Sequence, residues 1–198
     1  MSDQPRSPAV RLSREDLELG LAEMISKLSD LKERAEIRIV GGAAIALWHN
    51  AERGSTVDID AILIPSDTIV RVAKAVARER SWDYGWLNDK ARIFLPSGMG
   101  QRGEEWLTVY AKDDVTVQVA SLDMLIAMKL NAALRRGRRE IEDLQVLLAE
   151  RGVTSVEDAE EIFEAFYPGD AFNERCAQVV AAALAHPVKA RVEPPRFS

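Results

Sequence analysis

Cysteine is nearly absent from this chain of 198 residues, because Cys176 is the only one. A single cysteine excludes an intrachain disulfide and a cysteine-rich zinc site. Histidine is almost as rare, and His49 and His186 are too few and too isolated to indicate a histidine-based metal centre. Long apolar runs are also missing, since no stretch approaches the roughly 20 residues that a membrane-spanning helix needs. We therefore expect neither a disulfide scaffold, nor a zinc module, nor contact with a membrane.

A surplus of basic residues is lacking as well, since the formal net charge is −6 at pH 7. Such a balance does not indicate a general nucleic-acid-binding protein. The hydrophobic content of 47% and the charged content of 29% are those of an ordinary globular protein. The length suits one domain, or two small subdomains, with a sizeable core. Residues 1–10 lack the apolar segment of a secretory signal, so the cytoplasm is the expected location.

The most informative segment begins with a short strand, 37–40, that leads into Gly41 and Gly42. Glycines can bring the backbone close to a phosphate because they lack a Cβ. The helix expected next, Ala43 to His49, would point its free N–H groups and positive dipole end at the same place. A Gly-Gly pair is also a common turn, but in this position it predicts a phosphate-binding one.

Two carboxylates follow within an apolar stretch, Thr56 to Ala61, which we expect to be a strand. Asp58 and Asp60 are two residues apart, so their side chains would leave from one face of that strand. Acidic residues are depleted in strands, and two carboxylates on one face suit Mg²⁺. An isolated Asp-x-Asp is often a solvated strand end. Together with the glycines it predicts a site for a nucleoside triphosphate and its Mg²⁺.

Periodicity predicts the remaining organisation of the chain. An amphipathic helix is expected from Ser13 to about Ala35, and two antiparallel strands over 106–111 and 115–120. From Ser121 onward the pattern is helical. We therefore predict an α/β (α+β) architecture, with a small mixed sheet flanked by helices. The predicted divisions are a core over 1–120, a helical subdomain over 121–186 and a disordered tail over 187–198.

Two ionisable residues stand out in the helical part. Lys129 lies in an apolar helix, and an unpaired buried ammonium costs several kcal/mol, so it must reach a carboxylate, a phosphate or solvent. Snorkelling at the helix edge is the alternative. Asp143 lies on the flank of the apolar face of the next helix, where it is either solvated or directed across towards Lys129. Glu140 and Glu142 are poorer candidates.

Two further clusters have open interpretations. The arginine-rich run 135–139 joins two helices, and it is either a solvated linker or a patch for a triphosphate or an RNA backbone. Trp82, Tyr84 and Trp86 either fill the core or stack a base, since every base offers a π-face.

The order of these motifs resembles the polymerase-β-like nucleotidyltransferase superfamily, whose signature is a Gly-Gly or Gly-Ser turn, a short helix and an Asp-hydrophobic-Asp strand. Residues 40–47 and 56–60 match that signature. Residues 127–130, Ala-Met-Lys-Leu, and 142–144, Glu-Asp-Leu, match a minimal bacterial branch that includes the AbiEii-like abortive-infection toxins. The resemblance covers about residues 36 to 150.

The resemblance implies Mg²⁺-dependent transfer of a nucleoside monophosphate from an NTP to a hydroxyl. It further implies an RNA acceptor such as a tRNA end, and a toxin role with an antitoxin protein as partner. The residues carried over are, for Mg²⁺, Asp58 and Asp60; for the nucleotide, Gly41, Gly42, Thr56 and Lys129; and for catalysis, Asp58, Asp60, Lys129 and Asp143.

The chain departs from the superfamily pattern in two places. Relatives often place an arginine four residues before the first aspartate, where this chain has Gly54 after Arg53. The usual third carboxylate, a general base on a later strand, is replaced at the expected position by Gln118. Two rival functions therefore stay open. One is a nucleotidyltransferase acting on a small molecule, as aminoglycoside-modifying relatives do, and the other is a non-catalytic nucleotide-binding or interaction module.

Overall fold

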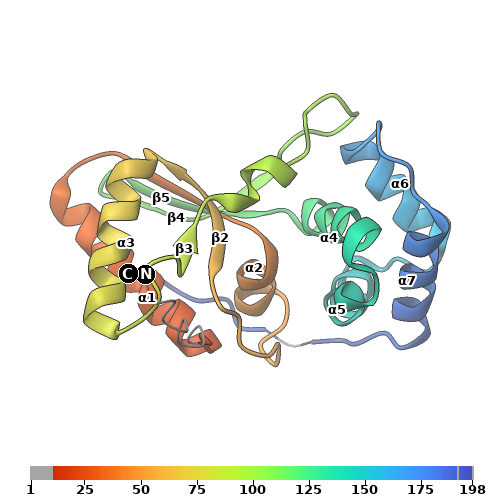
Figure 1. The fold of residues 1–198 in the computed structure, drawn as a ribbon, viewed down its shortest axis with the longest axis horizontal. Coiled ribbons are helices and arrows are strands. Elements are labelled where there is room, and N and C mark those ends of the chain that lie inside the picture. Colours follow the sequence, from red (N-terminus) through yellow and green to blue (C-terminus); the bar gives the residue numbers. More distant parts are fainter. Residues whose placement is uncertain (1–10, 191, 198) are drawn as a thin grey trace, which may run out of the picture.

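A mixed sheet of five strands forms the centre of the molecule, and a group of helices lies beyond one end of it (Figure 1). The computed structural model describes residues 11–190 and 192–197. The predicted α/β fold, with a small mixed sheet flanked by helices and a helical C-terminal part, is confirmed. The elements in chain order are α1 (Arg14–Leu31), β1 (Ala35–Ile39), α2 (Gly41–Trp48), β2 (Ile59–Ile64), α3 (Ser66–Arg80), β3 (Leu87–Asn88), η1 (Lys90–Phe94), β4 (Trp106–Lys112), β5 (Val115–Ala120), α4 (Leu122–Arg136), η2 (Gly137–Glu140), α5 (Ile141–Arg151), α6 (Val156–Phe166) and α7 (Glu174–Ala185).

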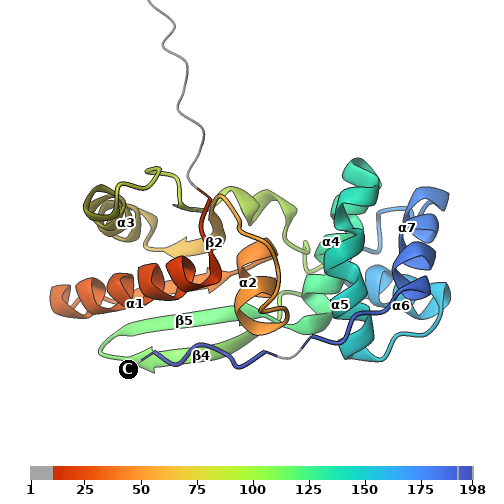
Figure 2. The ribbon, with the colours of Figure 1, turned by 90° about the horizontal axis from the view of Figure 1, so that it is seen from below.

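The sheet has the order β3-β2-β1-β5-β4. Strand β1 pairs antiparallel with β2 and parallel with β5, while β4 and β5 form the predicted antiparallel pair. One face is apolar and buried, because alternate residues of β1 and β5 are buried. Helix α1 lies along β5 (Figure 2) and packs against α3. The other face carries the partly exposed residues Glu36, Arg38, Thr116 and Gln118. Asp60 belongs to this second face, because it alternates with buried Ile59 and Ala61.

Helix α1 begins where its sequence predicts. The Ser13 hydroxyl accepts a hydrogen bond from the backbone N–H of Asp16, and the Asp16 carboxylate accepts one from the N–H of Ser13. The helix ends at Leu31, before the predicted Ala35, because Lys32 adopts a left-handed conformation with φ 53°. Ala35 instead begins β1.

The segment around the glycines and aspartates differs from the prediction in two boundaries. Helix α2 begins at Gly41 rather than Ala43, so both glycines belong to its first turn. Strand β2 begins at Ile59, and Asp58 therefore lies just before the strand. The reason is that the backbone of Thr56 pairs with Leu12, outside the β2 ladder. Thr56 also donates its hydroxyl hydrogen to the Asp58 carbonyl oxygen, at 3.3 Å.

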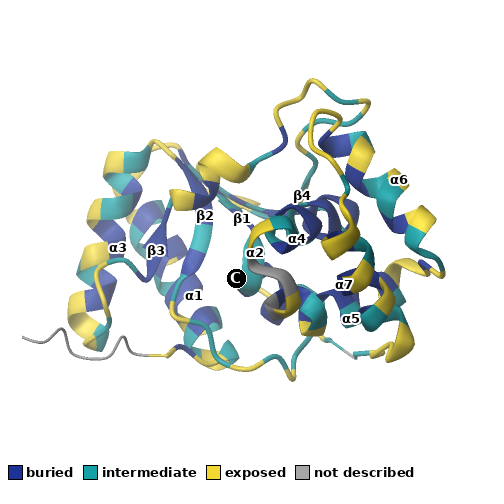
Figure 3. Ribbon diagram, turned by 45° about the vertical axis from the view of Figure 1, so that its right-hand side comes forward, coloured by how far each residue is buried: buried dark blue, intermediate teal, exposed yellow. Residues whose placement is uncertain are grey.

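Helix α4 leaves the end of β5 after one residue and is buried along much of its length (Figure 3). Helices α5, α6 and α7 pack around it. Their ends follow sequence signals: Gly152 terminates α5 with φ 76°, and Ser155 caps α6 by accepting a hydrogen bond from the N–H of Asp158. No helix among the described residues is long and apolar enough to cross a membrane.

The described residues after α7, 186–190 and 192–197, have no regular secondary structure, and the chain runs back from the helices towards the sheet (Figure 2). The N–H of Val188 donates to the carbonyl oxygen of Gln145 in α5, and Arg14 of α1 donates to the carbonyl oxygen of Glu193. Phe197 meets the ring of Tyr110 edge-on, with centroids 6.5 Å apart. The disorder of 187–198 and the division at residue 120 stay predictions. Residues 1–10, in which we expect no secretory signal, lie outside the described residues.

Candidate functional site

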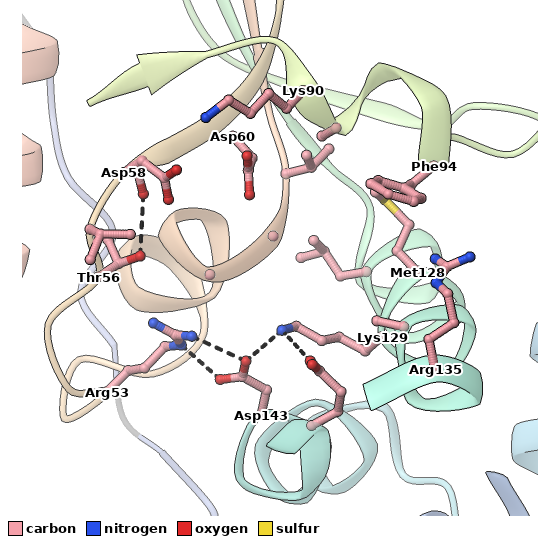
Figure 4. A pocket seen from close by; sticks show the side chains of 18 residues that line it. Arg53, Thr56, Asp58, Asp60, Lys90, Phe94, Met128, Lys129, Arg135 and Asp143 are labelled. Carbon is pink, nitrogen blue, oxygen red and sulfur yellow. Dashed lines mark hydrogen bonds and ion pairs between the residues drawn. The ribbon is translucent and has the colours of Figure 1, made fainter. Parts of the chain in front are cut away.

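A cavity of about 540 Å³ lies between the sheet and the helical part. Its walls come from the start of α2, the loop before β2, η1, α4 and the segment from η2 into α5 (Figure 4). The volume falls within the 300–1,000 Å³ that is usual for small-molecule sites. All the residues selected from the sequence line it: Gly41, Gly42, Thr56, Asp58, Asp60, Lys129 and Asp143.

The N-terminus of α2 enters the cavity with bare backbone. Val40 precedes the helix and contributes no side-chain cap, so capping does not engage the first N–H groups of α2. Gly41 has φ +66°, a backbone conformation that residues with a side chain rarely adopt. A Cβ at Gly42 would lie only 2.8 Å from Nη2 of Arg53, so the missing side chain lets the guanidinium approach. The result is a helix N-terminus with uncapped N–H groups and a cation beside it, which is an arrangement that suits an anion.

Asp58 and Asp60 occupy one side of the cavity, with Lys90 beside them (Figure 4). Asn88 of the short edge strand β3 donates its amide hydrogen to Oδ2 of Asp58, at 3.1 Å. Burial raises the pKa of the Asp58 carboxyl, and the Lys90 charge and the Asn88 hydrogen bond offset only part of this rise. A carboxylate in this state gains from a nearby cation.

The opposite side of the cavity carries an ion-pair network centred on Asp143 (Figure 4). Arg53 donates to both of its carboxylate oxygens, Nε to Oδ1 at 2.7 Å and Nη2 to Oδ2 at 3.2 Å. The Nζ of Lys129 lies 2.7 Å from Oδ2 of Asp143 and 2.7 Å from Oε2 of Glu140. Asp143 is only 6% exposed and Glu140 only 5%. The network therefore joins the loop before β2 to α4 and α5.

The pKa of Asp143 lies below its ordinary value although burial acts against this. Burial alone raises the pKa, but the hydrogen bond from Arg53 and the charge of Lys129 lower it further than burial raises it. Asp143 is therefore ionised at neutral pH and is a weak proton acceptor. Periodicity left open whether this acid is solvated, and the structure shows it buried and paired.

The strand register decides which residue of β5 lies level with Asp60. Ile39 of β1 pairs with Ala61 of β2 and with Val119 of β5. One residue further along, Val40 lies between Asp60 and Ala120, and the N–H of Val40 donates to the Asp60 carbonyl oxygen at 3.0 Å. Ala120, and not Gln118, therefore occupies the place across the sheet from Asp60. Gln118 lies two residues away in the row of Arg38, and its amide donates to the hydroxyl of Thr108.

Residues 18–167 match a family described as nucleotidyltransferase of unknown function, DUF6036. The chain belongs to this family. The matched range includes every residue selected from the sequence, so these cavity residues lie within the part of the chain that matches the family. The match supports the general class and not the AbiEii-like branch in particular. Comparison with curated proteins gives no match, and neither does comparison with solved structures.

Several residues that line the cavity were not selected from the sequence. Glu140 was one of the poorer candidates, yet its carboxylate accepts a hydrogen bond from Lys129. The sequence signal that could have identified it is its spacing of three residues from Asp143. Lys90 and Phe94 line the cavity from η1, a segment without helical or strand periodicity. Arg53 lines the cavity from the loop before β2, and its partner Asp143 lies 90 positions away in the sequence.

The arginine-rich run is only partly visible. Arg135 lines the cavity, lies 4.8 Å from the centroid of Phe94 and donates to the side-chain oxygen of Asn131. Arg138 is exposed, and the side chains of Arg136 and Arg139 lie outside the described residues. One arginine of the run thus belongs to the cavity wall, where its guanidinium lies over the Phe94 ring.

Proposed function

We propose that the chain transfers a nucleoside monophosphate from an NTP to a hydroxyl group and releases pyrophosphate. The observation that carries the proposal is the arrangement of Asp58 and Asp60 opposite Arg53 and Lys129, across a cavity that the glycine end of α2 enters. Carboxylates for a metal, backbone amides and cations for phosphates are the parts that phosphoryl-group transfer needs. The family match supports the same class of reaction.

The donors present fit Mg²⁺, which prefers hard oxygen ligands and commonly binds through one or two carboxylates plus substrate phosphates. Among the described residues, no group of three or more His, Cys, Asp or Glu is arranged to hold a metal ion. Two carboxylates alone do not fill the coordination shell of Mg²⁺, so Asp58 and Asp60 would hold it together with phosphate oxygens and water. Bound Mg²⁺ would neutralise phosphate charge and help to align the reacting groups.

The charges of the cavity favour a nucleotide that brings a metal ion with it. The basic side chains Arg53, Lys90, Lys129 and Arg135 are balanced by the acidic ones Asp58, Asp60, Glu140 and Asp143. A triphosphate without a cation would meet repulsion from Asp58 and Asp60. This balance supports the prediction that NTP binding depends on Mg²⁺.

Each residue then has a defined task. The amides of Gly41 and Gly42 and the side chain of Lys129 would bind the β- and γ-phosphates and stabilise the pyrophosphate as it leaves. The acceptor oxygen bonds to the α-phosphorus, the bond from that phosphorus to the bridging oxygen breaks, and the hydroxyl proton passes to solvent. Thr56 holds the backbone at Asp58. We assign Asp143 the role of orienting Arg53 and Lys129, because its lowered pKa makes it a weak base.

Isothermal titration with each of the four NTPs, with and without Mg²⁺, tests the proposal. Wild type should bind at least one NTP in a Mg²⁺-dependent manner, and Asp58→Asn/Asp60→Asn should abolish that binding. The matched control is Asp113→Asn/Asp114→Asn, which removes the same charge from an exposed turn whose left-handed backbone suits asparagine. Loss of binding in both double variants, or no binding by wild type, would count against the proposal.

The acceptor is proposed to be RNA, such as a tRNA end, on the strength of the resemblance to the AbiEii-like branch. Incubation with α-labelled NTP, total RNA and a panel of aminoglycosides separates the two acceptor classes by where the label goes. A toxin role with an antitoxin partner rests on the same resemblance. It predicts that expression of wild type arrests growth and that expression of Asp58→Asn/Asp60→Asn does not.

A nucleotide-binding module without catalysis is the second candidate, because Ala120 stands level with Asp60 and leaves that position without a carboxylate. The two candidates differ in one result. Mg²⁺-dependent NTP binding without transfer of label to any acceptor would favour the module, whereas labelled product would exclude it.

A further inference from the structure

A row of basic side chains lies on the outer face of α3, far from the cavity. Arg71, Lys74 and Arg78 follow one another at spacings of three and four residues, so they share one face of the helix. All three are exposed, whereas Ile69, Val72, Ala73 and Val76 are buried on the other face. They border a hollow of about 640 Å³ that also includes Tyr84. We call Arg71, Lys74, Arg78 and Tyr84 the α3 surface.

The three cations of the α3 surface keep their charges available. Other basic residues nearby are paired, since Arg80 bonds Glu23 and Lys27 bonds Glu79. By contrast, no hydrogen bond or ion pair joins Arg71, Lys74 or Arg78 to another residue in the described part of the chain. The hydrogen bond with Lys27 is the main cause that lowers the pKa of the Glu79 carboxyl, and the charge of Arg78 does lie close enough to help lower it. Asp67 is the one acidic residue that lines the hollow. The surface is thus locally positive in a protein whose formal net charge is −6.

Tyr84 gives this surface an aromatic face. Of the three aromatic residues of this segment, Trp86 is buried and donates its indole N–H to the Ala73 carbonyl oxygen at 2.9 Å. Trp82 packs on Trp86 with ring centroids 5.1 Å apart. Tyr84 is 59% exposed, so its ring does not serve the core. Aromatic rings beside cations are how proteins bind single-stranded nucleic acid: the cations contact phosphates and the rings stack on bases.

We propose that the α3 surface binds single-stranded RNA, as the body of an acceptor whose terminal hydroxyl reaches Asp58. This inference rests on the proposed nucleotidyl transfer. The chain itself connects the two places, because Tyr84 leads through β3 to Asn88, which bonds Asp58, and then to Lys90 at the cavity. Lys90 is six positions after Tyr84, and a chain of that length can span at most about 20 Å. A strand of RNA following β3 would therefore run from the basic row into the cavity.

Fluorescence anisotropy of a short labelled single-stranded RNA tests this surface. In Arg71→Ala/Lys74→Ala/Arg78→Ala, the slope of log K against log salt should become shallower by about 2, since each lost phosphate contact removes roughly 0.7. Tyr84→Ala should weaken binding by tenfold or more at fixed salt, and Tyr84→Phe should not, because the ring is retained. The matched control is Arg34→Ala/Lys112→Ala/Arg175→Ala, which removes the same charge at exposed sites on other elements.

The outcomes separate this inference from the proposed function. Three results would overturn the proposed role of the α3 surface. The first is an equal loss of RNA affinity in the α3 and control variants, and the second is an unchanged RNA affinity in Tyr84→Ala. The third is that polyglutamate displaces the labelled RNA as effectively as unlabelled RNA does. NTP titration is the second readout, and the α3 variant should bind Mg²⁺-NTP as wild type does. If wild type binds no NTP but RNA binding depends on the α3 surface, the RNA surface stands and the nucleotidyl-transfer proposal fails.

Discussion

Replacing Asp143 by asparagine removes one negative charge from between Arg53 and Lys129 and leaves the shape of the side chain nearly unchanged. Removing one partner of a buried ion pair lowers the free energy of unfolding by about 3–5 kcal/mol. The lower end applies here, because Lys129 keeps Glu140 at 2.7 Å and the Arg53 side chain is 23% exposed. We therefore expect a loss of about 3 kcal/mol at pH 7, which lowers the melting temperature by roughly 6–12 °C in a chain of this size.

The pH dependence gives this prediction a second check. A carboxyl whose pKa is lowered in the folded state stabilises the protein above its unfolded pKa, about 3.9, and this contribution disappears as the pH falls through the folded value. The difference between wild type and Asp143→Asn in urea unfolding should therefore be full at pH 7 and shrink below about pH 4.

Glu142→Gln is the matched control, because Glu142 is the exposed neighbour of Asp143 and should change stability by less than about 0.5 kcal/mol. The reasoning is refuted if Asp143→Asn is no more destabilising than Glu142→Gln. It is also refuted if the difference between Asp143→Asn and wild type persists unchanged in acid.

Three further predictions concern single positions. Gly42→Ala places a Cβ 2.8 Å from Nη2 of Arg53 and should weaken Mg²⁺-NTP binding roughly tenfold in titration, whereas Gly54→Ala, with open space around it, should not. Gly20→Ala brings a Cβ to 2.8–2.9 Å from the rings of Trp82 and Trp86, and urea unfolding should show a loss of about 1–3 kcal/mol. Ser155→Ala removes the cap of α6 and should cost about 1 kcal/mol, and an unchanged midpoint would contradict that role.

Much of this fold could be predicted from local pattern. The caps at Ser13 and Ser155, the stop at Gly152 and the paired strands β4 and β5 each depend on a few neighbouring residues. The glycines of α2 and the carboxylates around β2 could also be selected, because their chemistry is unusual for their positions. Local sequence therefore indicated which residues of these two segments would line the cavity.

The rest of the site depends on contacts between distant segments. Arg53 meets Asp143 across 90 positions, and no periodicity in either segment records that contact. The residue level with Asp60 could not be identified as Ala120 without the register of β2, β1 and β5. Lys90 and Phe94 lie in η1, whose placement follows from the pairing of β3 with β2. Packing between elements, rather than propensity within them, determines these positions.

The segment after α7 has a mechanical consequence for the cavity. Hydrogen bonds fasten Val188 to α5 and Glu193 to α1. The segment therefore connects the helical part with the part of the molecule that contains the sheet, and the cavity lies between these two parts. Five residue steps join Val188 to Glu193, so their Cα atoms can lie at most about 18 Å apart. The chain therefore acts as a tether that limits how far α5 can swing away from α1 while both fastenings hold. Cutting it with a protease would lift that limit without altering a single residue of the cavity.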